Sequence, residues 1–238
     1  VDGRDLEAWI REKPDRPWRE TLRMFVDAGK GLAAAHAKGI LHRDFKPANV
    51  LVGHDDWVRV SDFGLARIMA PDDTSPLALD VSGIAPETMD TSVSVAGRVV
   101  GTPYFMAPEQ IEGVATVRSD LYAFCLALRD ALFGVRAFQA RSLMELAVLK
   151  SKGPPKAPAD ARGVPAAVRA AIDKGLQPEP EARWDGMAPL LAVLERALRP
   201  GSRAAWPWLL GIGAVGATLY ATTPAETCTG ADTALASV

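Results

Sequence analysis

A carboxylate and a carboxamide stand five residues apart within the stretch His42–Asn49, which reads HRDFKPAN. Transfer of a γ-phosphoryl group needs a carboxylate that orients the attacking hydroxyl, and Mg²⁺ held by oxygen ligands against the phosphates. Asp44 suits the first task, and Asn49 with the later Asp62 suits the second. Lys46 lies between Asp44 and Asn49 and can reach the same phosphate as a point charge. These residue types predict a phosphoryl-transfer site.

Two more motifs follow along the chain, a D-F-G at residues 62–64 and an A-P-E at residues 107–109. A lone D-F-G is most often an ordinary turn, and a lone H-R-D is most often a solvated loop. All three motifs in this order and spacing are far more specific. On these motifs the chain resembles the bacterial membrane-anchored Ser/Thr protein kinases, and the resemblance runs from about Val1 to about Leu198.

The resemblance implies ATP and Mg²⁺ as cofactors and protein Ser or Thr hydroxyls as acceptors. Lys46, two residues after Asp44, and the segment 101–110 (GTPYFMAPEQ) favour the Ser/Thr branch over the tyrosine kinases. By this resemblance, Asp44 orients the substrate hydroxyl and Lys46 steadies the transferred phosphoryl group. Asn49 and Asp62 hold Mg²⁺.

Two further residues of the reaction site are implied by the same resemblance. Thr102 would border the substrate hydroxyl and contact the catalytic Asp and Lys. Leu51 would form the floor of the adenine pocket. The resemblance also implies structural or regulatory roles for four residues of the motifs, His42, Arg43, Phe63 and Gly64.

Three charged residues outside the catalytic loop are expected to support it. Asp120 resembles the Asp at the start of the long central helix that holds the catalytic-loop backbone. Glu109 of the A-P-E motif and Arg183 resemble a buried ion pair, so the two should meet although about 70 residues separate them. The alternative is two unrelated surface charges.

Apolar residues recur at helical spacing between Pro17 and Ala37, which predicts an amphipathic helix that ends near Gly39. Two short strands are expected at residues 49–52 and 57–60, joined by a turn-rich connection. Further helices are expected at residues 119–133, 142–150, 165–175 and 187–198. The expected fold is therefore that of a protein kinase, with residues 1–198 forming a mainly α-helical large lobe that contains a short two-stranded element.

The segment 68–99 is rich in Asp, Ser and Thr and poor in aromatic residues. Such a composition buries little surface, so we expect a long flexible insertion in the activation segment. It is either a phosphorylated regulatory loop that docks on Arg43 through charge-assisted hydrogen bonds or a passive insertion. The composition does not favour one over the other.

Parts of a complete kinase have no counterpart before His42. No G-x-G-x-x-G occurs there, and Lys13, Lys30 and Lys38 stand in helix-like or turn contexts rather than on a strand. We therefore expect that the small lobe is missing from this chain, that the sequence is a fragment, and that the chain alone is inactive. The alternative function is that of a non-catalytic pseudokinase acting as a membrane-tethered binding scaffold.

The C-terminal segment 204–225 contains no charged residue and is long enough to span much of a bilayer. Residues 199–203 form a basic linker before it, and no Lys or Arg follows, so the positive-inside bias places the kinase lobe in the cytoplasm and residues 226–238 outside. The expected localisation is the cytoplasmic membrane, with a single pass. A buried Gly/Ala-rich helix is the competing interpretation. Gly213 and Ala217 form a small-xxx-small pair, a weak sign of a homodimer.

Composition excludes several other classes of protein. The 238 residues, 48% of them hydrophobic, can bury a sizeable core. A formal net charge of -2 gives no electrostatic footprint for nucleic acid. The two cysteines, Cys125 and Cys228, form neither a disulfide framework nor a zinc site.

Overall fold

The computed structural model describes residues 3–53, 57–63, 102–158 and 163–199, all of which belong to one unit, Val1–Arg199. The predictions made for Gly64, for the insertion at residues 68–99 and for the tail from residue 200 onward lie outside these ranges. Within the described ranges, no helix combines the length and apolarity needed to cross a membrane.

The expected helices and strands of the lobe are present, with ends shifted by at most two residues. The helix predicted at residues 187–198 is matched at both ends. In chain order the elements are β1 (Gly3–Asp5), α1 (Leu6–Glu12), α2 (Trp18–His36), η1 (Pro47–Asn49), β2 (Val50–Gly53), β3 (Val58–Val60), α3 (Thr102–Phe105), α4 (Pro108–Ile111), α5 (Val117–Phe133), α6 (Leu143–Ser151), α7 (Ala166–Gly175), η4 (Pro180–Ala182) and α8 (Met187–Leu198).

The prediction of a two-stranded element is wrong, because the sheet has a third strand. The sheet has three antiparallel strands in the order β1-β2-β3, with Arg4 opposite Val52 and Leu51 opposite Arg59. A three-residue strand such as β1 is too short to show a period-2 pattern, so only its pairing with β2 reveals it. Asp5 then caps α1, because its Oδ1 accepts a hydrogen bond from the Ala8 amide.

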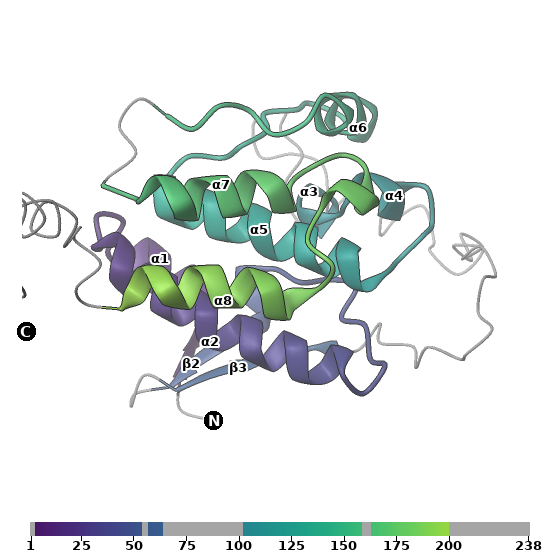
Figure 1. The fold of residues 1–238 in the computed structure, drawn as a ribbon. Coiled ribbons are helices and arrows are strands. Elements are labelled where there is room, and N and C mark those ends of the chain that lie inside the picture. The colour runs from purple at the N-terminus through teal and green to yellow at the C-terminus, as the bar shows by residue number, and fades with distance from the viewer. Residues whose placement is uncertain (1–2, 54–56, 64–101, 159–162, 200–238) are drawn as a thin grey trace, which may run out of the picture. The chain divides into compact units, whose positions relative to one another are not determined.

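Helix α5 is the buried centre of the lobe. It begins at Thr116, whose hydroxyl accepts from the amides of Arg118 and Ser119, and it ends at Gly134 in the left-handed conformation. Thirteen of its side chains are buried. A helix that is buried around most of its circumference needs packing on several sides. Helices α2 and α7 pack against it, and α8 packs against both of these (Figure 1).

The core reaches directly under the catalytic loop. The ring of Phe45 lies 5.6 Å from that of Phe124 on α5, and Phe124 meets Phe25 of α2 edge-on at 5.8 Å. Phe45 is 1% exposed. Because Phe45 follows Asp44 directly, the loop is anchored in the hydrophobic core of the lobe.

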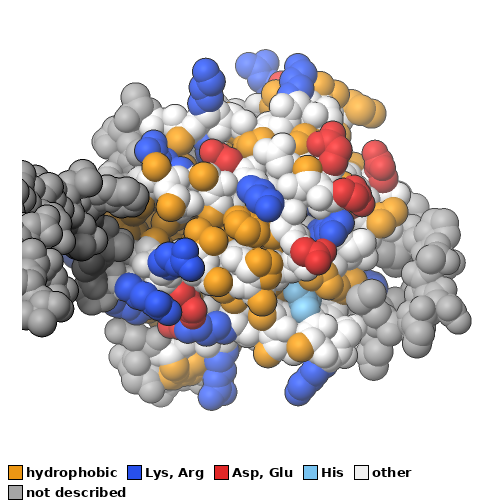
Figure 2. All heavy atoms as spheres, viewed as in Figure 1, with side chains coloured by type: hydrophobic (Ala, Val, Ile, Leu, Met, Phe, Trp, Pro, Cys, Tyr) orange, Lys and Arg blue, Asp and Glu red, His pale blue; other side chains and the backbone are white. Residues whose placement is uncertain are grey.

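Helix α6 presents an apolar face to solvent. Leu143, Met144 and Val148 are 43%, 76% and 48% exposed, and Figure 2 shows hydrophobic side chains at the outer end of this helix. A lone exposed apolar residue needs no explanation, but three on one short helix form a patch. The described residues leave this patch uncovered.

Candidate active site

The backbone of the catalytic loop is held by a single buried carboxylate. Asp120, 1% exposed on α5, accepts hydrogen bonds from the amide of His42 at 2.8 Å and from the amide of Arg43 at 2.7 Å. Its Oδ2 also lies 2.8 Å from Nε2 of His36, at the end of α2. A buried carboxylate needs such partners, and in satisfying them Asp120 fixes where the loop begins.

Arg43 and Asp62 are the described non-glycine residues with positive φ, at 68° and 56°. A non-glycine residue pays roughly 1–3 kcal/mol for this conformation, so surrounding contacts must impose it. For Arg43 those contacts are the bond from its amide to Asp120 and the bond that its carbonyl accepts from the Gln110 side chain at 2.9 Å. Such strain gathers at functional sites.

The side chains of Asp44, Lys46 and Asn49 converge. Lys46 Nζ lies 2.8 Å from Asp44 Oδ2, and Asn49 Nδ2 donates to the same oxygen at 3.2 Å and to the Asp44 carbonyl at 2.9 Å. The carboxylate of Asp44 is 16% exposed, so it is oriented by neighbours yet reachable by a substrate hydroxyl. An amide that donates through Nδ2 keeps its Oδ1 as the acceptor atom for a cation.

Asp62 is tied to Asn49 through Ser61. The Asn49 carbonyl accepts from the Ser61 amide at 2.8 Å and from its hydroxyl at 3.1 Å, and the Ser61 hydroxyl lies 3.2 Å from Asp62 Oδ2. Asp62 itself is exposed. One exposed carboxylate and one amide oxygen fit Mg²⁺, which usually takes one or two protein ligands plus phosphate oxygens and water. Within the described ranges, no group of three or more His, Cys, Asp or Glu side chains forms a separate metal site.

His42 connects the two motifs behind the site. Its Nε2 lies 2.9 Å from the Ser61 carbonyl, and its ring lies 4.7 Å from that of Phe63 and 5.8 Å from that of Phe45. His42 is completely buried. A buried imidazole with a fixed partner is a structural element, so it sets the relative position of Asp44 and Asp62.

Leu51 and Thr102, the two remaining candidates for the reaction site, lie in β2 and α3. Leu51 is the half-buried second residue of β2, directly after the loop. Thr102 is the first residue of α3. Their roles toward adenine and substrate stay predictions.

The contact predicted between Glu109 and Arg183 is present. Arg183 Nη1 and Nη2 lie 2.7 and 2.8 Å from the two carboxylate oxygens of Glu109, a bidentate pair. Arg183, 3% exposed, also donates to the carbonyls of Arg118, Gln177 and Pro178, so its buried charge is fully hydrogen-bonded. The alternative of two unrelated surface charges is excluded.

Comparison with known proteins settles the family. The family model described as the protein kinase domain matches residues 1–188. This chain belongs to the protein kinase domain family. The chain is 32% identical over 199 residues to the serine/threonine-protein kinase PknE of Mycobacterium tuberculosis. The aligned region covers 83% of this chain and 32% of PknE. The chain is 30% identical over 200 residues to PknH of the same species, covering 83% of this chain and 29% of PknH.

A third relative comes from another species. A probable serine/threonine-protein kinase of Clostridium perfringens is 30% identical over 199 residues, which covers 82% of this chain and 26% of that protein. The chain thus spans about a third or less of the length of these curated relatives.

One buried residue of the kinase domain had no signal in the sequence. Lys150 of α6 is completely buried and donates to the carbonyl of Tyr104 at 2.7 Å and to that of Met106. Its Nζ lies 5.4 Å from the centre of the Tyr122 ring. Burial lowers the pKa of Lys150 to about 7. Lys150 therefore fixes the C-terminal end of α3 and the following Met106 to α6.

Proposed function

We propose that the chain carries the large lobe of a Ser/Thr protein kinase that transfers the γ-phosphoryl group of ATP to Ser or Thr hydroxyls of proteins. The observation that supports this most directly is the Asp44 carboxylate with Lys46 Nζ at 2.8 Å and Asn49 Nδ2 at 3.2 Å. Phosphoryl transfer depends on positioning and charge stabilisation, and this cluster supplies both.

Each residue of the cluster has a distinct task in the proposed reaction. Asp44 orients the acceptor hydroxyl and takes its proton, while Lys46 holds the phosphoryl oxygens. Asn49 and Asp62 hold Mg²⁺, which offsets the charge on the phosphates when it is bound. Thr102 borders the acceptor hydroxyl, and Leu51 supports the adenine ring. The geometry of Asp44, Lys46 and Asn49 supports these assignments.

Regulation through Arg43 is the part of the proposal that concerns the activation segment. Arg43 Nε is buried and finds no partner among the described residues. A phosphorylated Ser or Thr of the segment 68–99 would supply charge-assisted hydrogen bonds to that guanidinium. The segment itself lies outside the described residues.

A phosphoryl-transfer assay tests the proposal. The natural protein that carries this chain, given Mg-ATP and protein substrates, should label Ser and Thr at roughly 1–100 per second, and chelation of Mg²⁺ should abolish the labelling. Before His42 the sequence has no G-x-G-x-x-G and no Lys in a strand-like context for the α/β-phosphates. For that reason, the chain alone should turn over far more slowly than the natural protein.

The second candidate function is a membrane-tethered pseudokinase scaffold. The scaffold function is favoured by the lack of the Gly-rich loop and the strand Lys before His42, and it is opposed by the intact cluster around Asp44. Absence of transfer by the natural protein, together with Mg-ATP-independent binding of partners, would select the scaffold over the enzyme.

Membrane attachment is a separate proposal. The uncharged stretch of residues 204–225 after the basic linker 199–203 supports one span, with the kinase domain in the cytoplasm. A thiol reagent that cannot cross membranes should then label Cys228 in intact cells. Cys125 cannot serve as the internal control, because it is completely buried.

A cysteine introduced at the exposed Ser151 of α6 provides that control. It should be spared in intact cells and labelled after lysis. In intact cells, labelling at position 151 of the Ser151→Cys protein without labelling at Cys228 would indicate the opposite orientation. Equal protection of both sites before lysis would contradict the proposed membrane span.

A further inference from the structure

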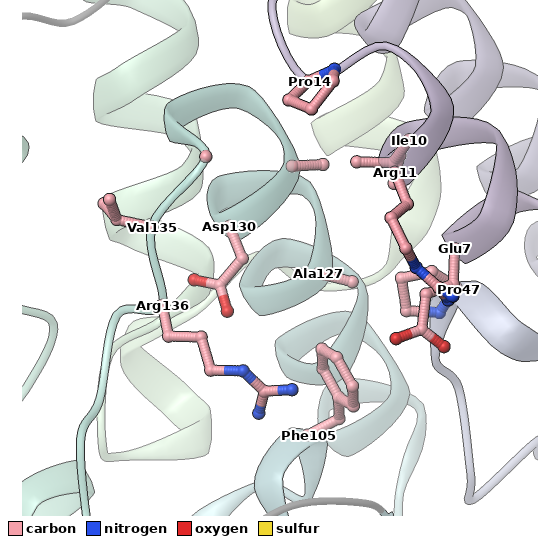
Figure 3. A pocket seen from close by; sticks show the side chains of 12 residues that line it. Glu7, Ile10, Arg11, Pro14, Pro47, Phe105, Ala127, Asp130, Val135 and Arg136 are labelled. Atoms are coloured by element: carbon pink, nitrogen blue, oxygen red, sulfur yellow. The ribbon is translucent and has the colours of Figure 1, made fainter.

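A pocket of about 420 Å³ opens beside the catalytic loop. Its walls come from α1, from Pro47 of η1, from Phe105 of α3 and from the C-terminal end of α5 with the turn that follows it (Figure 3). Pro47 stands three residues after Asp44, and Phe105 stands three residues after Thr102. The pocket therefore adjoins the segments that would flank an acceptor hydroxyl.

The lining of the pocket combines apolar and charged side chains. Ile10, Ala127 and Phe105 supply apolar surface, which suits the stem of an amino-acid side chain. Arg11 and Arg136 come from opposite sides, α1 and the turn after α5 (Figure 3). Neither guanidinium forms an ion pair with any residue in the described ranges.

The two acidic residues of the pocket, Glu7 and Asp130, differ in how far their oxygens are already hydrogen-bonded. Asp130 Oδ2 accepts the Tyr104 hydroxyl at 2.6 Å, its Oδ1 accepts the Ala137 amide at 2.8 Å, and Arg129 Nη1 lies 3.8 Å away. Burial raises the pKa of Asp130 to about 6, while the charges of Arg129 and Arg136 lower it, so Asp130 still carries most of its negative charge at neutral pH. Glu7 alone remains as an exposed carboxylate against two guanidinium groups.

The wall that carries Phe105 is held in place by the buried lysine. Lys150 binds the carbonyls on both sides of Phe105, those of Tyr104 and Met106. Arg136 stacks over the Tyr104 ring at 4.2 Å. Phe105 and Arg136 are thus held in place before binding, which lowers the entropic cost of binding.

We propose that this pocket is a substrate subsite that takes an anionic side chain, carboxylate or phosphate, from the peptide segment around the acceptor Ser or Thr. The proposal rests on the proposed kinase function. Arg11 and Arg136 bind the anionic oxygens, and the apolar walls cover the stem. A basic side chain would meet two guanidinium groups, and of the two acids only Glu7 has a carboxylate that is not already hydrogen-bonded as that of Asp130 is.

The test uses the natural protein and Ser-centred peptides in which each flanking position is in turn Glu, phosphoserine, Lys or Ala. At one position or more, kcat/KM should be about five-fold higher for Glu than for Lys, as expected for two partly exposed ion pairs. The arm with phosphoserine separates a phosphate from a carboxylate preference. Arg11→Glu with Arg136→Glu should reverse the order at that position.

Arg23→Glu, on an exposed position of α2 outside the pocket, is the matched control and should keep the wild-type preference. Equal rates for Glu and Lys at every position, a Lys preference, or the same response from the pocket and control variants would overturn the subsite. Active protein without anion preference refutes only the subsite. If no peptide is phosphorylated, the proposed function fails. In that case, direct binding of the Glu and Lys peptides to the protein tests the subsite, which should bind the Glu peptide more tightly.

Discussion

Replacing Asp44 by Asn should lower phosphoryl transfer by about 10²–10⁴-fold, because the amide cannot accept the proton of the substrate hydroxyl. The two side chains have nearly the same shape, and the Asp44 carboxylate is 16% exposed, so little packing changes. We expect kcat to fall while the thermal unfolding midpoint stays close to that of the wild type. Assays of the natural protein with Mg-ATP and a protein substrate measure the first quantity, and calorimetry measures the second.

The control for this variant is Asp27→Asn. Asp27 lies on α2, pairs with Lys30 at 3.1 Å and is 40% exposed, so the same chemical change there should leave activity unaltered. Near wild-type turnover by the Asp44→Asn protein would remove Asp44 from its proposed role. Loss of activity in both variants would point to a general effect of charge.

Replacing Arg183 by Met should lower the free energy of unfolding by about 3–5 kcal/mol, because it leaves the Glu109 carboxylate without its guanidinium partner. The side chain of Arg183 is fully buried and that of Glu109 is 12% exposed, so water does little to replace the lost partner. The Ser119 hydroxyl, which donates to Glu109 Oε1 at 2.7 Å, is one neutral donor that remains for this carboxylate. Urea unfolding measures the difference.

Arg118 and Asp185 form the matched surface pair. They lie 2.7 Å apart, but their side chains are 30% and 90% exposed, so Asp185→Asn should cost between about 0 and 1 kcal/mol. The double variant Glu109→Met with Arg183→Met should lose less than the sum of its single variants, because no charge is then left unpaired. An Arg183→Met cost as small as that of Asp185→Asn would contradict the structural role of the buried pair.

The sequence by itself determined the helices, the order of the motifs and one long-range contact. Amphipathic spacing placed α2, since its apolar residues recur every three or four residues. The pairing of Glu109 with Arg183 followed from the family pattern, because a buried charge in that pattern needs a partner. The residue types in His42–Asn49 identified a phosphoryl-transfer site before any geometry was known.

Only the tertiary structure decided how these pieces meet. The strand β1 exists because it pairs with β2, and a three-residue segment shows no pattern of its own. The positive φ of Arg43 comes from contacts with Asp120 and Gln110, which stand 77 and 67 residues away in the chain. Lys150 looks like a solvated charge in the sequence, yet α6 buries it against the carbonyls of Tyr104 and Met106. Each of these features depends on partners distant in sequence, and local propensity carries no record of such partners.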